Sequence, residues 1–286
     1  MAFRLRTDES VRSGLERIVR GELRRAVDQL GGIDLSEEAI HEARKSIKKV
    51  RAVLQLVGDD IGANGTLKHL RRAGRLLAPL RDADALTDTA KKLCARQHTS
   101  LSRAVCATVR ERLDERQSRL SGSRRSRRLN KEAAAELRKT QRLAKRWNWG
   151  RIDASDLAAE IQRGYKQARR GLERARPRHG ANALHSWRKR VKTLWCALRL
   201  LPRHTPGITR VMDALERVET ALGEDHNLVV LRTRLSRSLN VPGVARVFSL
   251  AEQRQHALRR VALTSGERQF SEPPKAFARR VERVLS

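Results

Sequence analysis

The sequence predicts an all-α fold, and three features of its patterning and composition support this class. Apolar residues recur at helical spacing through nearly the whole chain, whereas the alternation typical of strands is hard to find. Proline occurs only seven times in 286 residues, so little interrupts the helical pattern. The hydrophobic fraction of 39% is enough for a folded core, and the length suits two domains of ordinary size or one of double size.

The first half of the chain divides into helical segments that are separated by turn signals. Gly31 and Gly32 end the first segment, and Ser36, followed by two glutamates, caps the second. The sequence SGSRRSRRLN before the last segment is expected to be a basic, flexible loop that could add a second polyanion contact. The expected segments are 8–30, 36–57, 66–78, a fourth that begins near Asp82 and Asp84, 100–120 and 130–147.

The helix over residues 41–57 is the segment around which the chain is organised. On a helical projection its apolar residues fall on one side, and His41, Arg44, Lys45 and Lys48 fall on the other. Like charges at this spacing repel one another, so the pattern predicts a polyanion that neutralises them.

The second half of the chain repeats the first. HEARKSIK at residues 41–48 corresponds to HSWRKRVK at 185–192, and LRDAD at 80–84 corresponds to GEDHN at 223–227. The predicted organisation is therefore two helical-bundle repeats, 1–150 and 151–286. Asp82, Asp84 and Asp225 are expected to cap helices or to hold neighbouring arginines.

The charge of the chain indicates acidic partners. There are 63 Lys and Arg residues against 32 Asp and Glu, a net charge of +31, which suits nucleic acid, polyphosphate or an anionic membrane. Aromatic residues make up only 3% of the chain, which disfavours binding of single strands by base stacking but leaves duplex phosphate contacts open. No apolar run approaches the ~18 residues of a membrane span, so no membrane insertion is expected.

The cysteines and the N-terminus indicate a cytoplasmic protein. Cys94, Cys106 and Cys196 are an odd number without a CxxC pair, and we expect reduced thiols. The first residues lack the apolar region of a secretory signal.

No metal site is predicted, because Cys94 and His98 are four residues apart without further ligands. Trp187 and Trp195 are expected in the core.

A helix that carries HxxRKxxK, present twice and followed each time by an RDAD-like or EDHN-like segment, resembles the CHAD domain, the conserved histidine α-helical domain. The resemblance extends over essentially the whole chain. It implies two four-helix-type bundles, related by a pseudo-twofold axis, that flank a central basic cavity or channel. It also implies binding of inorganic polyphosphate and association with polyphosphate granules. Some members are fused to a CYTH triphosphatase domain, whose ExExK-type strand this sequence lacks.

The resemblance and the basic stripes together define the candidate binding residues. Thr193 and Trp195 stand where the first repeat has Lys49 and Arg51, and the second repeat adds the acids Asp213, Glu216 and Glu219. We therefore expect an asymmetric site that is stronger on the first repeat. The candidates are His41, Arg44, Lys45, Lys48, Lys49, Arg51, Lys68, Arg71, Arg72, Arg75, His185, Arg188, Lys189, Lys192 and Arg199.

These residue types suit phosphate recognition. Arginine forms bidentate contacts with phosphate oxygens, and lysine supplies a point charge. Polyphosphate favours the protonated form of a nearby histidine, so the sequence predicts tighter binding toward pH 6 through His41 and His185.

Binding without catalysis is the preferred interpretation. The motifs GxxxxGK[ST], HExxH and GxSxG are absent, and the basic stripes lack the clustered carboxylates that hold catalytic metals. No cofactor is predicted. The alternatives are a sequence-nonspecific nucleic-acid binder and, less favoured, an enzyme that processes polyphosphate.

Overall fold

The computed structural model describes residues 3–32, 36–95, 100–120, 123–176, 180–202, 205–238 and 243–285. These residues form α-helices and one short 3₁₀ helix, Trp149–Arg151, without a strand, and the predicted all-α class is confirmed. The helices of the first half are α1 (Val11–Gln29), α2 (Glu37–Val57), α3 (Thr66–Leu76), α4 (Ala78–Cys94), α5 (Ser100–Leu120) and α6 (Arg124–Ala144). Those of the second half are α7 (Ala154–Ala175), α8 (Gly180–Leu198), α9 (Pro206–Ser238), α10 (Val244–Gln269) and α11 (Pro274–Leu285).

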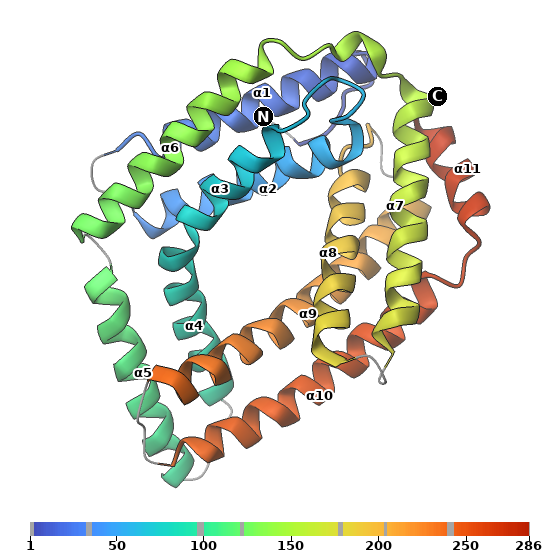
Figure 1. The fold of residues 1–286 in the computed structure, drawn as a ribbon. Coiled ribbons are helices and arrows are strands. Elements are labelled where there is room, and N and C mark those ends of the chain that lie inside the picture. Colours follow the sequence, from blue (N-terminus) through green and yellow to red (C-terminus); the bar gives the residue numbers. More distant parts are fainter. Residues whose placement is uncertain are drawn as a thin grey trace.

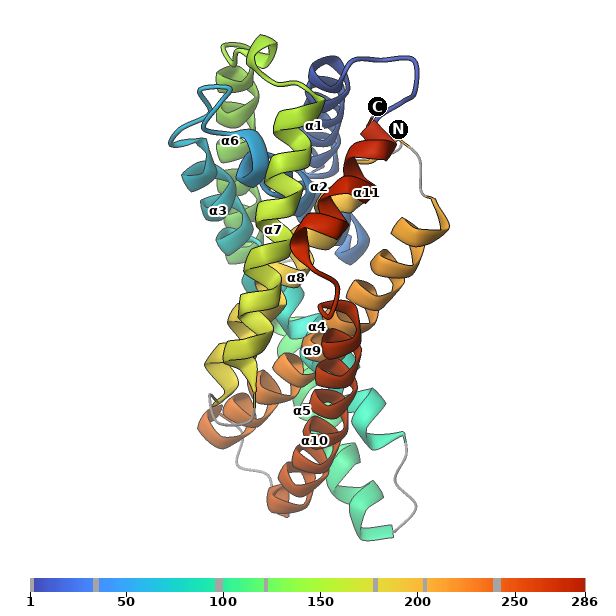
Figure 2. The ribbon, with the colours of Figure 1, turned by 90° about the vertical axis from the view of Figure 1, so that its right-hand side faces the viewer.

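The helices are arranged as a ring with four sides (Figure 1). One side contains α1, α2, α3 and α6, and the next contains α4 and α5. The third side is the pair α9 and α10, and the fourth consists of α7, α8 and α11, with α11 packed against α7 (Figure 2). Helices of the two halves meet where α2 contacts α7 and α8 and where α4 and α5 contact α9 and α10.

Local signals explain where the central helices begin and how they pack. Ser36 caps α2 by accepting a hydrogen bond from the Ala39 amide at 3.1 Å, and Asp153 and Asp156 form a capping box at the start of α7. The apolar face of α2 is buried and packs mainly against α1. Trp187 on α8 is fully buried, as predicted, and Trp195 is half-buried.

The aspartates of the repeated segment do not cap helices. Helix α4 begins at Ala78, directly after α3, so Asp82 and Asp84 lie within it. Pro79 occupies the first turn of α4, where its missing N–H costs no helical hydrogen bond, and it accounts for the break between α3 and α4. Asp225 lies inside α9 and is buried, and its Oδ1 accepts a hydrogen bond from Arg259 Nε at 2.8 Å. For Asp225 the alternative of holding an arginine is therefore the one observed.

The expected basic loop SGSRRSRRLN is mostly helix. Ser123 caps α6 by accepting a hydrogen bond from the Ser126 amide at 3.1 Å, and the arginines that follow form the first turns. Arginine has a high helix propensity, and a serine cap satisfies one of the free amides, so the segment folds once α6 packs on α1 and α3. Ser121 and Gly122 lie outside the described residues.

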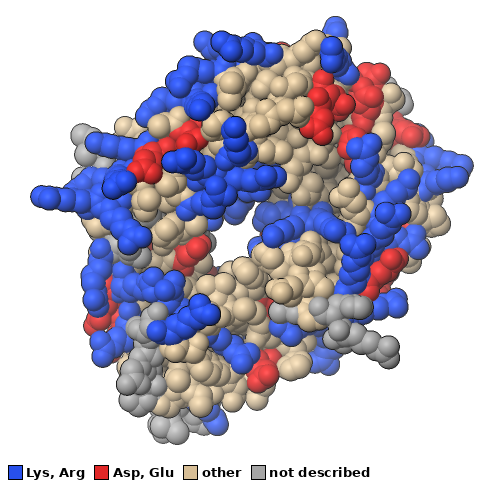
Figure 3. Space-filling view, in the orientation of Figure 1, with Lys and Arg blue, Asp and Glu red and all other residues tan. Residues whose placement is uncertain are grey.

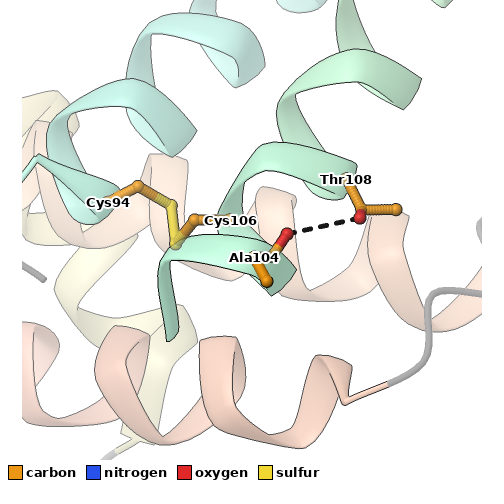
Figure 4. Close-up of a disulfide and its surroundings, with 4 residues drawn as sticks. All are labelled: Cys94, Ala104, Cys106 and Thr108. Atoms are coloured by element: carbon orange, nitrogen blue, oxygen red, sulfur yellow. Dashed lines mark hydrogen bonds between the residues drawn. A yellow bond between two sulfur atoms is a disulfide. The ribbon is translucent and has the colours of Figure 1, made fainter. Parts of the chain in front are cut away.

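The prediction of three reduced cysteines is wrong. Cys94, at the end of α4, forms a disulfide with Cys106 on α5, with a Cα–Cα distance of 5.8 Å (Figure 4). Cys196 is free and buried. The antiparallel packing of α4 against α5 brings the two thiols together, and sequence spacing alone does not reveal this proximity. His98, which was considered with Cys94, lies outside the described residues.

No helix in the described part of the chain is long and apolar enough to cross a membrane. This agrees with the expectation of no membrane insertion.

Two helical glycines offer a test of the packing around Trp187. A Cβ on Gly266 would lie 2.6 Å from Trp187 Cζ2, whereas a Cβ on Gly74 would meet no atom within 4 Å. We predict that Gly266→Ala destabilises the protein by about 1–3 kcal/mol because a rigid, buried indole cannot move aside. Gly74→Ala is the control and should stabilise by about 0.5–1 kcal/mol through helix propensity. Urea unfolding measures both, and equal effects would contradict the packing described.

Candidate functional site

A groove of about 310 Å³ between α2 and α3 gathers cationic side chains from both helices. Arg44 Nη1 donates a hydrogen bond to the Gly74 carbonyl oxygen at 2.9 Å and so connects the two helices. No acidic residue is among those that line the groove. Its charged lining is Arg44, Lys48 and Arg51 from α2 and Arg71 and Arg75 from α3.

The contact between α2 and α8 brings the two predicted motifs together. Solvent can reach the Lys48 side chain from the groove. Many protein atoms nevertheless surround it, and the resulting desolvation is the largest cause that lowers its pKa to about 8. The positive charges of Lys192, Arg44 and Arg188 lower the pKa of Lys48 further. Across the same contact, Thr193 Oγ1 lies 3.4 Å from Gln55 Oε1. The cations of both repeats are therefore close enough to repel one another.

Glu219 on α9 is the acidic residue at this contact. Its Oε1 accepts hydrogen bonds from Arg188 Nη2 at 2.9 Å and from Lys192 Nζ at 2.5 Å. Burial raises the pKa of Glu219, but the charges and hydrogen bonds of Lys192 and Arg188 outweigh burial and hold the pKa below its usual value. The carboxylate is thus ionised and neutralises part of the second motif.

Two of the predicted residues lie elsewhere. Lys49 Nζ donates to the buried Glu22 of α1 at 2.7 Å, and this carboxylate also accepts from Ser46 Oγ at 2.6 Å. The Arg199 guanidinium lies over the Trp195 ring at 4.7 Å and near the ring of Phe3, which Lys49 also approaches. Lys49 and Arg199 therefore stabilise the packing around the N-terminal segment, and neither lines the groove.

The remaining predicted residues surround the groove without lining it. Lys45 is exposed and pairs with Glu42 at 3.0 Å, and Arg72 pairs with Glu136 of α6 at 3.1 Å. Lys68, Lys189 and His41 are exposed on their helices. The structure thus separates these predicted residues into a groove, a second-repeat cluster around Glu219, the pair Lys49 and Arg199 near the N-terminal segment, and an exposed periphery.

Several buried donors near these residues make no hydrogen bond to the described part of the protein. They include the Nε atoms of Arg51 and Arg188 and the Nδ1 atom of His185. Burial, followed by the charge of Arg71, lowers the pKa of Arg51. The Nε–H groups of Arg51 and Arg188, which are buried without a hydrogen-bond partner, suit a ligand that is rich in acceptor oxygens.

His185 differs from the pH-dependent residue that the sequence predicted. Its ring stacks on His226 of α9 with centroids 4.4 Å apart. Burial lowers the pKa of His185 to about 4, and the charges of His226, Lys189 and Arg188 add to this effect. Without a ligand His185 is therefore neutral at pH 6. Its protonation next to bound polyphosphate stays a prediction.

Sequence reasoning did not select His226 or Glu219 as site residues. His226 corresponds to Ala83 in the repeat, so its position carries no duplicated signal. Glu219 was counted only as part of an acidic face, and helical spacing could not show that it reaches across to α8.

A space-filling view shows an opening in the middle of the ring (Figure 3). Lys and Arg side chains border its upper and right-hand sides, over α2, α3 and α8.

Comparison with known proteins identifies the family and supports the all-α fold. A family model described as the CHAD domain matches residues 17–236, which include both motif helices. The chain belongs to the CHAD domain family. A crystal structure titled as the CHAD domain from the plant Ricinus communis is similar, with a TM-score of 0.62, 20% sequence identity and coverage of 96% of each chain. At this identity the likeness shows the CHAD fold alone, and no curated protein matches the chain.

The histidine stack predicts acid sensitivity of this CHAD protein. The pKa of His185 is about 4 when folded against an ordinary 6.5, so the unfolded chain takes up its proton first as the pH falls. The contribution of His185 to stability is therefore fully present above pH 6.5 and decreases from there toward pH 4. We predict that His185→Gln reduces the loss of melting temperature between pH 7 and pH 5. His256→Gln, which changes an exposed histidine, is the control and should retain the loss seen in the wild type.

Proposed function

We propose that this CHAD protein binds inorganic polyphosphate in the groove between α2 and α3 and at the adjoining cations of α8. The observation that carries the proposal is the convergence of four arginines and Lys48 on one groove that no acidic residue lines. Such crowding costs stability in the free protein, and an anion with many charges removes that cost.

The chemistry of the groove suits polyphosphate better than a ligand that carries bases. Arginine pairs with phosphate oxygens in a bidentate manner, and partial enclosure strengthens each contact. The residues that line the groove include no aromatic ring on which a base could stack.

The binding surface is asymmetric in this proposal. The first repeat contributes Arg71 and Arg75 from α3, whereas the second repeat contributes Glu219 from α9, which occupies Arg188 and Lys192. Affinity should therefore depend more on the first repeat.

We infer a binding module and not an enzyme, because the groove offers cations without carboxylates to hold a catalytic metal. A cytoplasmic location, with association to polyphosphate granules, would fit such a module.

Nonspecific binding of nucleic acid is the second candidate. It is favoured by exposed cations outside the groove, such as Arg138 and Arg142 on α6 and Lys145 directly after it, which need no enclosed ligand. Long-chain polyphosphate should displace labelled duplex DNA readily, whereas DNA should displace polyphosphate poorly if the groove is the main site.

A matched pair of triple variants tests the proposal. Replacing Lys48, Arg71 and Arg75 by glutamine should weaken polyphosphate binding roughly 100-fold, because charge-assisted contacts are lost. Replacing Arg138, Arg142 and Lys145 removes the same residue types from α6 and the residue directly after it and should leave affinity nearly unchanged. Isothermal titration measures both. Equal weakening would show that total charge, and not the groove, determines binding.

Ligand binding should also stabilise the wild-type protein. With polyphosphate at about 100 times its Kd, we predict a rise in melting temperature of about 5 °C at low salt. The groove variant should show little rise, and a titration without any shift in the wild type would contradict the proposed function.

Glu219 should limit affinity while it stabilises the free protein. We predict that Glu219→Gln binds polyphosphate about tenfold more tightly, because Arg188 and Lys192 become available, and loses about 1–2 kcal/mol of stability. Glu216→Gln removes the same charge from an exposed position on α9 and is the control. Effects of the same size in both variants would indicate a change of overall charge alone.

A further inference from the structure

Lys48 differs from the other motif lysines that lie near it. It is the one lysine among four arginines in the groove, and within the described ranges no carboxylate lies within ion-pair distance of it. Lys45, one turn earlier on α2, pairs with Glu42 at 3.0 Å, and Lys192 pairs with Glu219 at 2.5 Å. Lys48 is also exposed, so a small molecule that enters the groove can reach its Nζ.

The environment of Lys48 favours the uncharged form of its amine. Burial and the charges of Lys192, Arg44 and Arg188 lower its pKa to about 8, and Glu219 opposes them only in part. A lysine in this state holds a substantial fraction of neutral amine near neutral pH, whereas a free lysine is almost entirely protonated. The neighbouring arginines stay charged and available for anions.

We propose that Lys48 is a site of covalent acylation by acyl phosphates, with Arg71 and Arg75 binding the phosphate while the Lys48 amine attacks the acyl carbon. This class of donor combines the two features that the groove recognises. Its phosphate is an anion that the arginines hold, and its carbonyl is an electrophile that an uncharged amine can attack.

The step balances without a further reactant. The Nζ lone pair forms a C–N bond to the acyl carbon, and the bond between that carbon and the bridging phosphate oxygen breaks. Phosphate leaves with the electron pair of this bond, stabilised by the arginine charges. The nitrogen releases one proton to solvent, and nothing is oxidised or reduced.

Acylation would alter the groove because an amide carries no charge. One of the five cations that line it would be lost, and the repulsion that opposes an empty groove would decrease. A weaker affinity for polyphosphate should result. This consequence rests on the proposed function, whereas the acylation itself does not.

The test compares two lysines in the same molecule. The folded chain of 286 residues is incubated with acetyl phosphate at pH 7.5, and acetylation of each lysine is followed over time by peptide mass spectrometry. We expect Lys48 to be acetylated about tenfold faster than Lys45, since its larger neutral fraction outweighs its lower basicity. Equal rates at Lys48 and Lys45 would overturn the proposal without recourse to any variant.

A second donor separates capture of the phosphate from reactivity of the amine. The acetyl ester of N-hydroxysuccinimide has no phosphate, so it reports the amine alone. The variant with Arg71→Gln and Arg75→Gln should lose most of the Lys48 preference with acetyl phosphate and little of it with the ester, and inorganic phosphate should slow only the former. Equal losses with both donors would overturn the role of the arginines.

Polyphosphate binding by the acetylated and unmodified proteins completes the experiment. Rapid acetylation of Lys48 in a protein that does not bind polyphosphate would support the acylation site and refute the proposed function. Binding of polyphosphate without faster acetylation of Lys48 would retain the proposed function and overturn this inference.

Discussion

Repulsion between like charges across the contact of α2 with α8 is the constraint on which the rest of the ring depends. Lys192 and Arg188 of α8 lie close enough to Lys48 of α2 to lower the pKa of Lys48, so these charges oppose the contact. Buried apolar faces on both helices offset it, and the ring is also joined where α4 and α5 meet α9 and α10. Apolar packing thus keeps close together, at fixed positions, charges that would otherwise move apart into water.

Carboxylates with little exposure decide which cations remain available. Glu22 of α1 forms an ion pair with Lys49 of α2, and Asp225 of α9 forms one with Arg259 of α10. Glu219, in contrast, lies at the α2–α8 contact itself and takes up two motif cations of the second repeat. Glu22 of the first half lies away from the groove, whereas Glu219 of the second half lies among the motif cations.

The helices and their basic faces could be predicted because 3.6-residue periodicity and capping are local properties. The spacing of Arg44 and Lys48 placed them on one stripe, and Arg51, which the sequence also predicts as a binding residue, lines the same groove. The sequence predicts Lys49 as a binding residue, but the structure pairs it with Glu22. Glu22 lies on another helix, so the local sequence pattern cannot reveal this pairing. The disulfide of Cys94 with Cys106 and the stack of His185 on His226 escaped prediction for the same reason.

The sequence by itself determined the all-α class, the repeated motif and the excess of positive charge, because each follows from residue type and spacing along the chain. Only the tertiary structure decided which cations share a groove, which are neutralised and which histidine loses its proton. Those outcomes depend on distances between helices and on the displacement of water, and neither is encoded in any single segment. Helix α2 therefore contributes the charges of the first motif, and its neighbours α3, α8 and α9 determine how those charges act.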